Sequence, residues 1–193
     1  MQNKTSLQKS ETTEEQKSPR RWATSNTIRA VEPNDAAALI TMIEAVGMFP
    51  PDELAEVGEM LNGYLDGSLG EDQFWLVDDD EGFAGAAYYA PERMTEGTWN
   101  LYMLAVHPER QGEGHGAALV RHVEQTLAAR GERLLLIETL GSEEFATQRA
   151  FYSNLGYEEE ARIRDFYIAG GDKVIFRKAL AAQVSTADDY SST

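Results

Sequence analysis

Apolar residues along the chain recur with two alternating spacings, one typical of amphipathic helices and the other typical of strands. The helical spacing predicts helices over residues 33–46, 52–64, 114–130 and 143–155. The shorter apolar runs predict strands over residues 27–31, 73–77, 83–90, 99–106, 133–138, 157–167 and 172–180. Hairpins at both ends and helical crossovers between them predict an α/β fold, in which a mixed sheet of about seven strands has helices on both faces.

The predicted elements form one domain between two tails. Residues 1–25 are rich in Ser, Thr, Glu, Gln and Lys and are expected to be disordered, and residues 181–193 are expected to be a flexible C-terminal tail. The domain over residues 26–180 has no cysteine, which excludes disulfides, thiolate metal sites and a cysteine nucleophile. Because no apolar run approaches the ~20 residues of a membrane helix and no secretory signal is present, we expect a cytoplasmic protein that does not bind membranes.

Charge narrows the class of partner. The chain carries a net charge of −16, and because the two tails cancel, residues 26–180 carry all of it. A domain this acidic repels phosphates, so nucleic acid is not an expected partner, whereas cationic small molecules or basic peptides are attracted. The alternative is that the negative charge serves only to keep the protein soluble.

No metal site is expected. The acidic run at residues 78–81 lacks the alternating ligand spacing and closing glutamate of an EF-hand, so it is interpreted as a solvated turn between two strands. His107, His115 and His122 do not share one face of the predicted helix and are not expected to ligate a metal.

The glycine-rich segment at residues 111–117 carries the clearest chemical signal. It reads Gln-Gly-Glu-Gly-His-Gly-Ala and joins the strand ending at Val106 to the helix after Gly114. Glycines let a backbone approach a ligand closely, and the unpaired N–H groups at a helix start attract anions. The segment therefore favours a phosphate-binding loop, with Arg110 beside it as a positive charge on an otherwise acidic protein.

Several interpretations of this loop remain open. The Gly-Lys-Ser/Thr ending of a P-loop is absent, but Gly112, Gly114 and Ala117 formally fit the dinucleotide pattern G-x-G-x-x-A. Gln111, Gly114 and Gly116 fit the pattern Q-x-x-G-x-G of acyl-CoA-dependent N-acyltransferases. A tight strand-to-helix turn without a ligand is the remaining alternative.

Three linked features resemble the GNAT superfamily of acetyl-CoA-dependent N-acetyltransferases. They are Val106-x-Pro108 followed by the glycine loop, the helix and strand leading to Ile137-Glu138-Thr139, and Arg149-Ala150-Phe151-Tyr152 followed by Gly156-Tyr157. The resemblance spans residues 28–180 and implies a sheet that splays after the fourth strand and leaves a V-shaped cleft. One departure is Phe145, which stands seven residues before the tyrosine where many members carry a cofactor-contacting asparagine.

The resemblance also implies where acetyl-CoA would bind. Its pantetheine arm would pair with the exposed edge of residues 103–106, and its pyrophosphate would rest on the loop amides. The implied cofactor-binding residues are Met103, Leu104, Ala105, Val106, Gln111, Gly112, Glu113, Gly114, His115, Gly116 and Ala117.

Two residues are candidates for proton transfer. A thioester needs a neutral amine, and an alkyl amine of pKa ~10 is only about 0.1% neutral at pH 7, so a base is required. Glu138 is the candidate base, because it ends an apolar strand where desolvation would raise its pKa; the alternative is that it orders a loop. The resemblance makes Tyr152 the general acid for the leaving thiolate, the alternative being an aromatic that packs the last helix on the sheet.

The sequence therefore predicts an enzyme that transfers an acetyl group from acetyl-CoA to a primary amine of a small molecule or peptide. A non-catalytic CoA-binding module is the alternative, and a nicotinamide-dependent oxidoreductase is a third. Tyr88, Tyr89, Trp99 and Tyr102 are candidates for the acceptor pocket, although alternation along a strand assigns about half of them to the core. A homodimer is expected on frequency alone.

Overall fold

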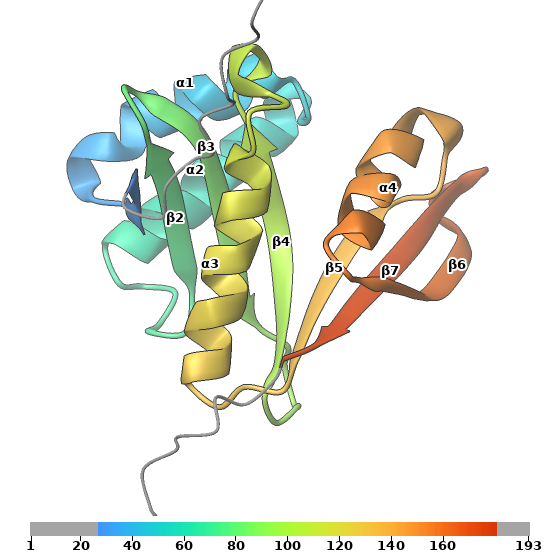
Figure 1. Cartoon of the computed structure of the whole chain (residues 1–193). Coiled ribbons are helices and arrows are strands. Elements are labelled where there is room, and N and C mark those ends of the chain that lie inside the picture. Colours follow the sequence, from blue (N-terminus) through green and yellow to red (C-terminus); the bar gives the residue numbers. More distant parts are fainter. Residues whose placement is uncertain (1–26, 181–193) are drawn as a thin grey trace, which may run out of the picture.

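The computed structural model describes residues 27–180, and both predicted tails lie outside the described residues (Figure 1). The strands are β1 (Ile28–Ala30), β2 (Phe74–Asp79), β3 (Phe83–Pro91), β4 (Thr98–Val106), β5 (Leu134–Leu140), β6 (Glu158–Ile168) and β7 (Gly171–Ala179). The helices are α1 (Ala36–Val46), α2 (Pro51–Leu65), α3 (His115–Ala129) and α4 (Ala146–Asn154). Short 3-10 turns precede α1 and α4, at Pro33–Asp35 and Glu143–Phe145. Each predicted element is present within a few residues of its expected bounds.

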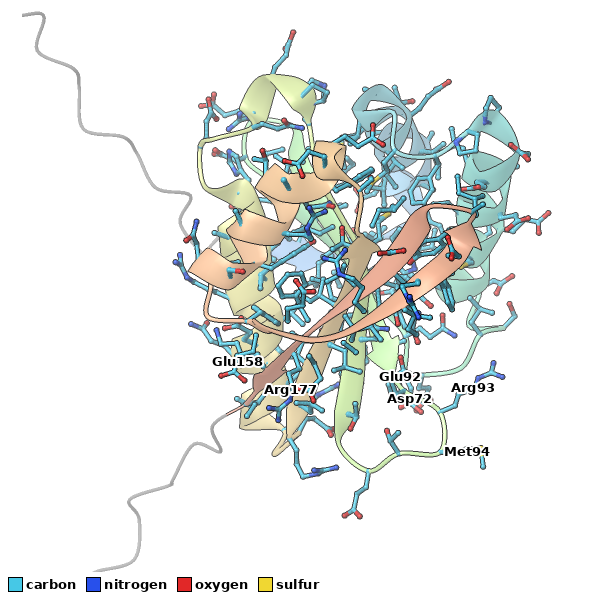
Figure 2. The ribbon with its side chains drawn as sticks, turned by 90° about the vertical axis from the view of Figure 1, so that its right-hand side faces the viewer. Asp72, Glu92, Arg93, Met94, Glu158 and Arg177 are labelled. Atoms are coloured by element: carbon cyan, nitrogen blue, oxygen red, sulfur yellow. The ribbon has the colours of Figure 1, made fainter. Side chains whose placement is uncertain are left out.

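The strands form one seven-stranded mixed sheet in the order β1-β2-β3-β4-β5-β7-β6. The first four strands are antiparallel neighbours, with α1 and α2 between β1 and β2 in the chain. Strand β4 pairs with β5 in parallel, and β7 lies antiparallel between β5 and β6. On the outer hairpin, Arg177 of β7 pairs with Glu158 of β6 at 3.7 Å (Figure 2). The mixed sheet that the sequence predicts is confirmed.

Helices cover both faces of the sheet. Helices α3 and α4 lie on one face, and α1 and α2 lie behind strands β2 to β4 on the other (Figure 1). We call these the α3–α4 face and the α1–α2 face. The core is divided accordingly: one buried cluster includes Leu119, Val123 and Ile137 on the α3–α4 face, and the other includes Leu39, Ile43 and Met103 on the α1–α2 face. Among residues 27–180, no helix combines the length and apolarity needed to cross a bilayer.

Strands β4 and β5 separate after a short paired segment. Their ladder joins Thr98–Leu101 to Leu134–Ile137 and then stops, although β4 continues to Val106 and β5 continues to Leu140 beside β7. The two strands part toward the end of the sheet at which α3 begins (Figure 1). The β4 edge after Leu101 therefore has no strand partner on this side, and the splayed sheet expected from the sequence is confirmed.

Candidate active site

A cavity of about 620 Å³ lies where β4 and β5 separate. It is bounded by the second half of β4, the glycine loop, the start of α3, one side of α4 and the end of α1 with the turn that follows it. Its lining residues are Val46, Met48, Leu104, Val106, Arg110, Gln111, Gly112, Gly114, His115, Gly116, Ala117, Glu144, Phe145, Thr147, Gln148, Phe151 and Tyr152. The fold thus brings the glycine loop and the tyrosine of α4, which are distant in the sequence, to one cavity.

The glycine loop presents free backbone N–H groups to this cavity. Gly112 and Gly114 have φ angles of 79° and 98°, in the left-handed region that residues with a Cβ rarely adopt. Within the described part of the chain, none of the amides of residues 111–117 donates a backbone hydrogen bond. These amides and the positive end of the α3 dipole create a site for an anion.

Gly116 allows the start of α3 to approach the neighbouring elements closely. A Cβ at this position would lie 3.3 Å from Cγ2 of Val106 and 3.5 Å from Cζ of Phe151. Glycine at this position therefore follows from close packing of the helix start against β4 and α4.

The His115 side chain is buried in a polar cluster at the start of α3. Its Nδ1 lies 2.7 Å from Oδ2 of Asp78, and these residues are 2% and 0% exposed. Thr27 donates its hydroxyl hydrogen to the other oxygen of Asp78. The interpretation of residues 78–81 as a solvated turn is therefore wrong for Asp78, which fixes the start of α3 to β2.

Arg110 lies at the cavity, as expected, but its charge is already engaged. Its guanidinium pairs with Asp80 at 2.9 Å and with Glu113 at 2.8 Å. Neither carboxylate belongs to a residue that lines the cavity. The isolated positive charge that the sequence suggested is instead an ion-pair network.

The four candidate residues of β4 divide between two environments. Leu104 and Val106 line the cavity. Met103 and Ala105 are buried in the core of the α1–α2 face, so only their backbone edge is available to a ligand on the β5 side. Glu113 is half exposed at the loop and does not line the cavity.

Tyr152 reaches the cavity from α4 on the α3–α4 face. It is 3% exposed, packs against Phe151, Tyr157 and Phe176, and has no hydrogen-bonding partner for its hydroxyl within residues 27–180. Burial raises the pKa of the phenol well above its ordinary value of about 10, which keeps it protonated at neutral pH.

The residues around Tyr152 in the sequence motif hold α4 in place. Arg149 donates from Nη1 to the carbonyls of Leu140 and Ser142 at 2.8 and 2.6 Å, which anchors the helix to the end of β5. Gly156 ends the helix region with a φ of 86°. The motif Arg-Ala-Phe-Tyr followed by Gly therefore fixes the orientation of the helix that carries the phenol.

Glu138 lies on the opposite face of the sheet from Tyr152. Its neighbours Ile137 and Thr139 are buried toward α4, so alternation turns Glu138 toward the α1–α2 face. Its side chain is 29% exposed and forms an ion pair with Lys173 of β7. The structure thus gives Glu138 a cationic partner and partial solvent contact instead of the dry environment that the sequence suggested.

A β-bulge places Tyr102 next to the point of separation. Tyr88 pairs with Met103 and Tyr89 with Leu101, so Tyr102 has no partner on β3, and the β5 ladder ends one residue before it. Tyr102 is 50% exposed and tilts against Tyr88, with the ring centroids 5.8 Å apart. Partial burial, Glu92 and Glu138 raise the pKa of Tyr102 to about 12. Tyr102 therefore adjoins two carboxylates.

Glu92 was not indicated by the sequence. Its Oε1 accepts hydrogen bonds from Nδ2 of Asn100 at 3.0 Å and from the Tyr102 hydroxyl at 3.2 Å. Figure 2 shows Glu92 turned back toward the strands, whereas Arg93 and Met94 of the same loop point away. In the described part of the chain, no Lys, Arg or His side chain pairs with Glu92. No sequence spacing marks this contact, because the bulge creates it.

The four aromatic candidates separate by face. Tyr89 and Trp99 are 2% and 5% exposed and pack with Phe74 in the core of the α3–α4 face. Tyr88 and Tyr102 lie on the other face. Tyr88 is also buried, at 8% exposed, so three of the four rings belong to the core and Tyr102 alone of the four is exposed; the expectation of about half is corrected.

Helix α4 contributes further lining residues that sequence reasoning missed. Phe145, Gln148 and Tyr152 are spaced by three and four residues, so they share one side of the helix start. Oε1 of Gln148 accepts a hydrogen bond of 2.6 Å from Thr139 of β5. Counting back from Tyr152 in steps of three and four residues would have identified these lining residues from the sequence. Phe145, set aside because it departs from the asparagine pattern, lines the cavity as an apolar side chain.

Comparisons with known proteins agree with this geometry. The acetyltransferase (GNAT) domain family matches residues 70–159. A solved GNAT-family acetyltransferase from Desulfovibrio desulfuricans is 36% identical and superposes with a TM-score of 0.74, covering 80% of this chain and 98% of that chain. The chain belongs to the GNAT family of N-acetyltransferases, which confirms the enzyme class and the fold predicted from the sequence.

Two further relatives are more distant. The bS18-alanine N-acetyltransferase of Escherichia coli is 28% identical over 142 residues, covering 74% of this chain and 87% of that protein. An aminoglycoside 6′-N-acetyltransferase solved with coenzyme A is 16% identical with a TM-score of 0.62, covering 79% of this chain and 96% of that chain. At this identity the second similarity establishes the fold alone.

Proposed function

We propose that this protein transfers the acetyl group of acetyl-CoA to a primary amine at the separation of β4 and β5. The carrying observation is that one cavity is lined both by free amides of the glycine loop and by the side chain of Tyr152, whose hydroxyl has no hydrogen-bonding partner within residues 27–180. An elongated thioester fits this arrangement, because its phosphates would lie at the loop amides and its thioester would lie near Tyr152. The solved relative with coenzyme A supports the choice of cofactor.

Three parts of the chain would hold the cofactor. The amides of residues 111–117 supply hydrogen-bond donors for phosphate, and the unpaired edge of β4 after Leu101 supplies backbone groups for an extended arm. The side chains of Leu104, Val106 and Phe151 supply apolar contact. Acetyl-CoA supplies the acetyl group as a thioester, which an amine nitrogen attacks with release of the thiol.

Tyr152 is the proposed general acid. Its raised pKa keeps a proton on the phenol, and no protein acceptor within residues 27–180 competes for that proton. The hydroxyl is therefore available to protonate the leaving sulfur.

Glu138 is the proposed base on the opposite face, where the acceptor would approach. It flanks the opening beside Tyr102, directly after the last paired residue, Ile137. Its carboxylate would take the ammonium proton directly or through water, while Lys173 orients it. This arrangement separates the residue that accepts a proton from the residue that donates one by the thickness of the sheet.

Glu92 is the proposed attraction site for the incoming cation. A protonated amine meets its carboxylate and the ring of Tyr102 before reaching Glu138. The relatives include enzymes named for an alanine of a ribosomal protein and for aminoglycosides, so we propose an acceptor amine on a small molecule or a peptide.

Two measurements on the full chain test this function. Calorimetry with coenzyme A is expected to show binding, and acetyl-CoA with a panel of cationic amines is expected to release CoA in an amine-dependent manner. Binding without amine-dependent release would indicate a CoA-binding module. Absence of binding to coenzyme A, combined with binding to NAD, would replace the proposal with a dinucleotide enzyme.

A further inference from the structure

Arg110 is the only lysine or arginine among residues 27–180 that lines the cavity. All three of its nitrogens have partners. Nε donates to Glu113 at 2.8 Å, Nη1 donates to the carbonyl of Asp80 at 2.9 Å, and Nη2 lies 2.9 Å from the Asp80 carboxylate and 3.0 Å from Nε2 of His115. The single cation at this cavity is therefore shared by two carboxylates.

These partners differ in how firmly they are held. Nε2 of His115 belongs to a ring that is 2% exposed and bonded through Nδ1 to the fully buried Asp78. Because a guanidinium has only donors, its contact with Nε2 makes Nε2 the acceptor and leaves Nδ1 to donate to the Asp78 carboxylate. Asp80 contacts two nitrogens of the guanidinium through its carboxylate and its carbonyl. His115 and Asp80 together fix the plane and position of the guanidinium.

The Glu113 carboxylate has fewer and weaker contacts than Asp80 or His115. It lies between Gly112 and Gly114 on the loop, its side chain is 50% exposed, and beyond Arg110 it reaches only Nε2 of His115, at 3.4 Å. An exposed ion pair of this kind contributes little and exchanges readily with solvent ions. Its carboxylate occupies Nε of Arg110, the cation that lines the cavity and that an incoming anion would meet.

The charges around Arg110 favour a change in its contact with Glu113 when a phosphate binds. Coenzyme A carries several negative charges, and residues 26–180 carry −16. A phosphate next to Arg110 with Glu113 in place would meet two carboxylates around one guanidinium. Displacing Glu113 frees a charge-assisted N–H donor and removes one of the two repulsive carboxylates.

We propose that Arg110 forms a phosphate-binding subsite for coenzyme A, and that Glu113 is an internal anion that occupies this subsite until the phosphate displaces it. The inference rests on the proposed use of acetyl-CoA. Glu113 lowers cofactor affinity in this arrangement, and it does so through Arg110. This dependence on Arg110 distinguishes the proposal from a general effect of loop charge.

A double-mutant cycle in the full chain tests the dependence. We would measure the Kd of coenzyme A by calorimetry at one pH and salt concentration. Glu113→Gln is expected to tighten binding about fivefold, and Arg110→Gln is expected to weaken it about tenfold. In the Arg110→Gln background, Glu113→Gln is expected to change the Kd by less than about 1.5-fold. Circular dichroism of each variant checks that the fold is retained.

Glu109→Gln is the matched control. Glu109 lies one residue before Arg110, its side chain is exposed, and its removal changes the net charge by the same amount. Equal tightening by Glu109→Gln and Glu113→Gln, or tightening that persists in the Arg110→Gln background, would overturn the proposal. The pantetheine arm alone, which has no phosphate, should bind wild type and Glu113→Gln equally.

The outcomes separate this inference from the proposed function. If wild type does not bind coenzyme A, the proposed function itself fails. If wild type binds and only the Glu113 effect is absent, the inference alone fails. Repeating the titration with 3′-dephospho-coenzyme A identifies the phosphate: a retained gain assigns Arg110 to the diphosphate, and a lost gain assigns it to the 3′-phosphate.

Discussion

The two faces of the sheet at the β4–β5 separation are built by different means. On the α3–α4 face, backbone amides, glycine φ angles and one buried phenol define the cavity. On the α1–α2 face, Glu92 of the loop after β3, Tyr102 of β4 and Glu138 of β5 meet because of a bulge and the end of a ladder. The first face depends on local sequence order and suits a cofactor shared by a family. The second depends on tertiary contacts and suits an acceptor particular to this protein.

Replacing the phenol tests the first face most severely. Tyr152→Phe is expected to lower kcat about 100-fold, because the leaving thiolate loses its proton donor, while the Kd of coenzyme A stays unchanged. Tyr157→Phe is the control, since this tyrosine is equally buried and adjoins Tyr152 but does not line the cavity. Because burial raises the pKa of Tyr152, wild-type kcat should not fall through its ionisation below about pH 10. Unchanged kcat in Tyr152→Phe would remove the phenol from the mechanism.

Removing the proposed base tests the second face. Glu138→Gln is expected to lower kcat about 30-fold without altering coenzyme A affinity, since the amide cannot accept the ammonium proton. Glu158→Gln, which removes an exposed carboxylate that also pairs with a cation, should leave kcat unchanged. Steady-state kinetics with the amine found in the CoA-release panel measures both. Equal kcat in the two variants would assign Glu138 to structure alone.

A backbone change should affect only the cofactor side. Gly114→Ala forces a Cβ onto a residue with a φ of 98°, so the loop amides are displaced and coenzyme A affinity should fall about tenfold. Gly67→Ala imposes similar strain at a φ of 77° in the loop after α2, away from the cavity. Calorimetry should show a normal Kd for this control. An equal loss in both variants would indicate general destabilisation.

The smallest expected effect concerns the attraction of the acceptor. Glu92→Gln should raise the KM for a cationic amine about threefold and leave the Kd of coenzyme A unchanged, because a carboxylate that is partly exposed to solvent interacts weakly with a passing cation. Glu96→Gln removes an exposed carboxylate from the same loop and is the control. A rise in KM of equal size in both variants would point to overall charge.

Sequence reasoning predicted the elements and the cofactor side well, for physical reasons. Helical spacing, turn glycines and the loop pattern at residues 111–117 are local signals, and the structure places eight of the eleven implied cofactor residues and Tyr152 around one cavity. The role of these residues remains a proposal. Their common location follows from the order of strand, loop and helix.

Contacts between segments that are distant in the sequence could not be predicted from these local signals. Asp78 and His115 are 37 positions apart, and Arg110 and Asp80 are 30 apart, so no local pattern showed that an apparently solvated acidic turn binds the glycine loop. Likewise, Glu92 meets Tyr102 only because Tyr102 is an extra residue in β4. Side chains that act through tertiary contact need the fold before their partners can be identified.

The brevity of the ladder between β4 and β5 has a thermodynamic consequence. Four residue pairs join the two strands, and the rest of the β4 edge has no strand beside it. A ligand that hydrogen-bonds along that edge would take the place of the missing β5 pairing, and it would bind only the folded chain. The Tm of the protein should therefore rise with the concentration of such a ligand, as mass action requires. The unpaired β4 edge that binds a ligand therefore also couples ligand binding to the stability of the fold.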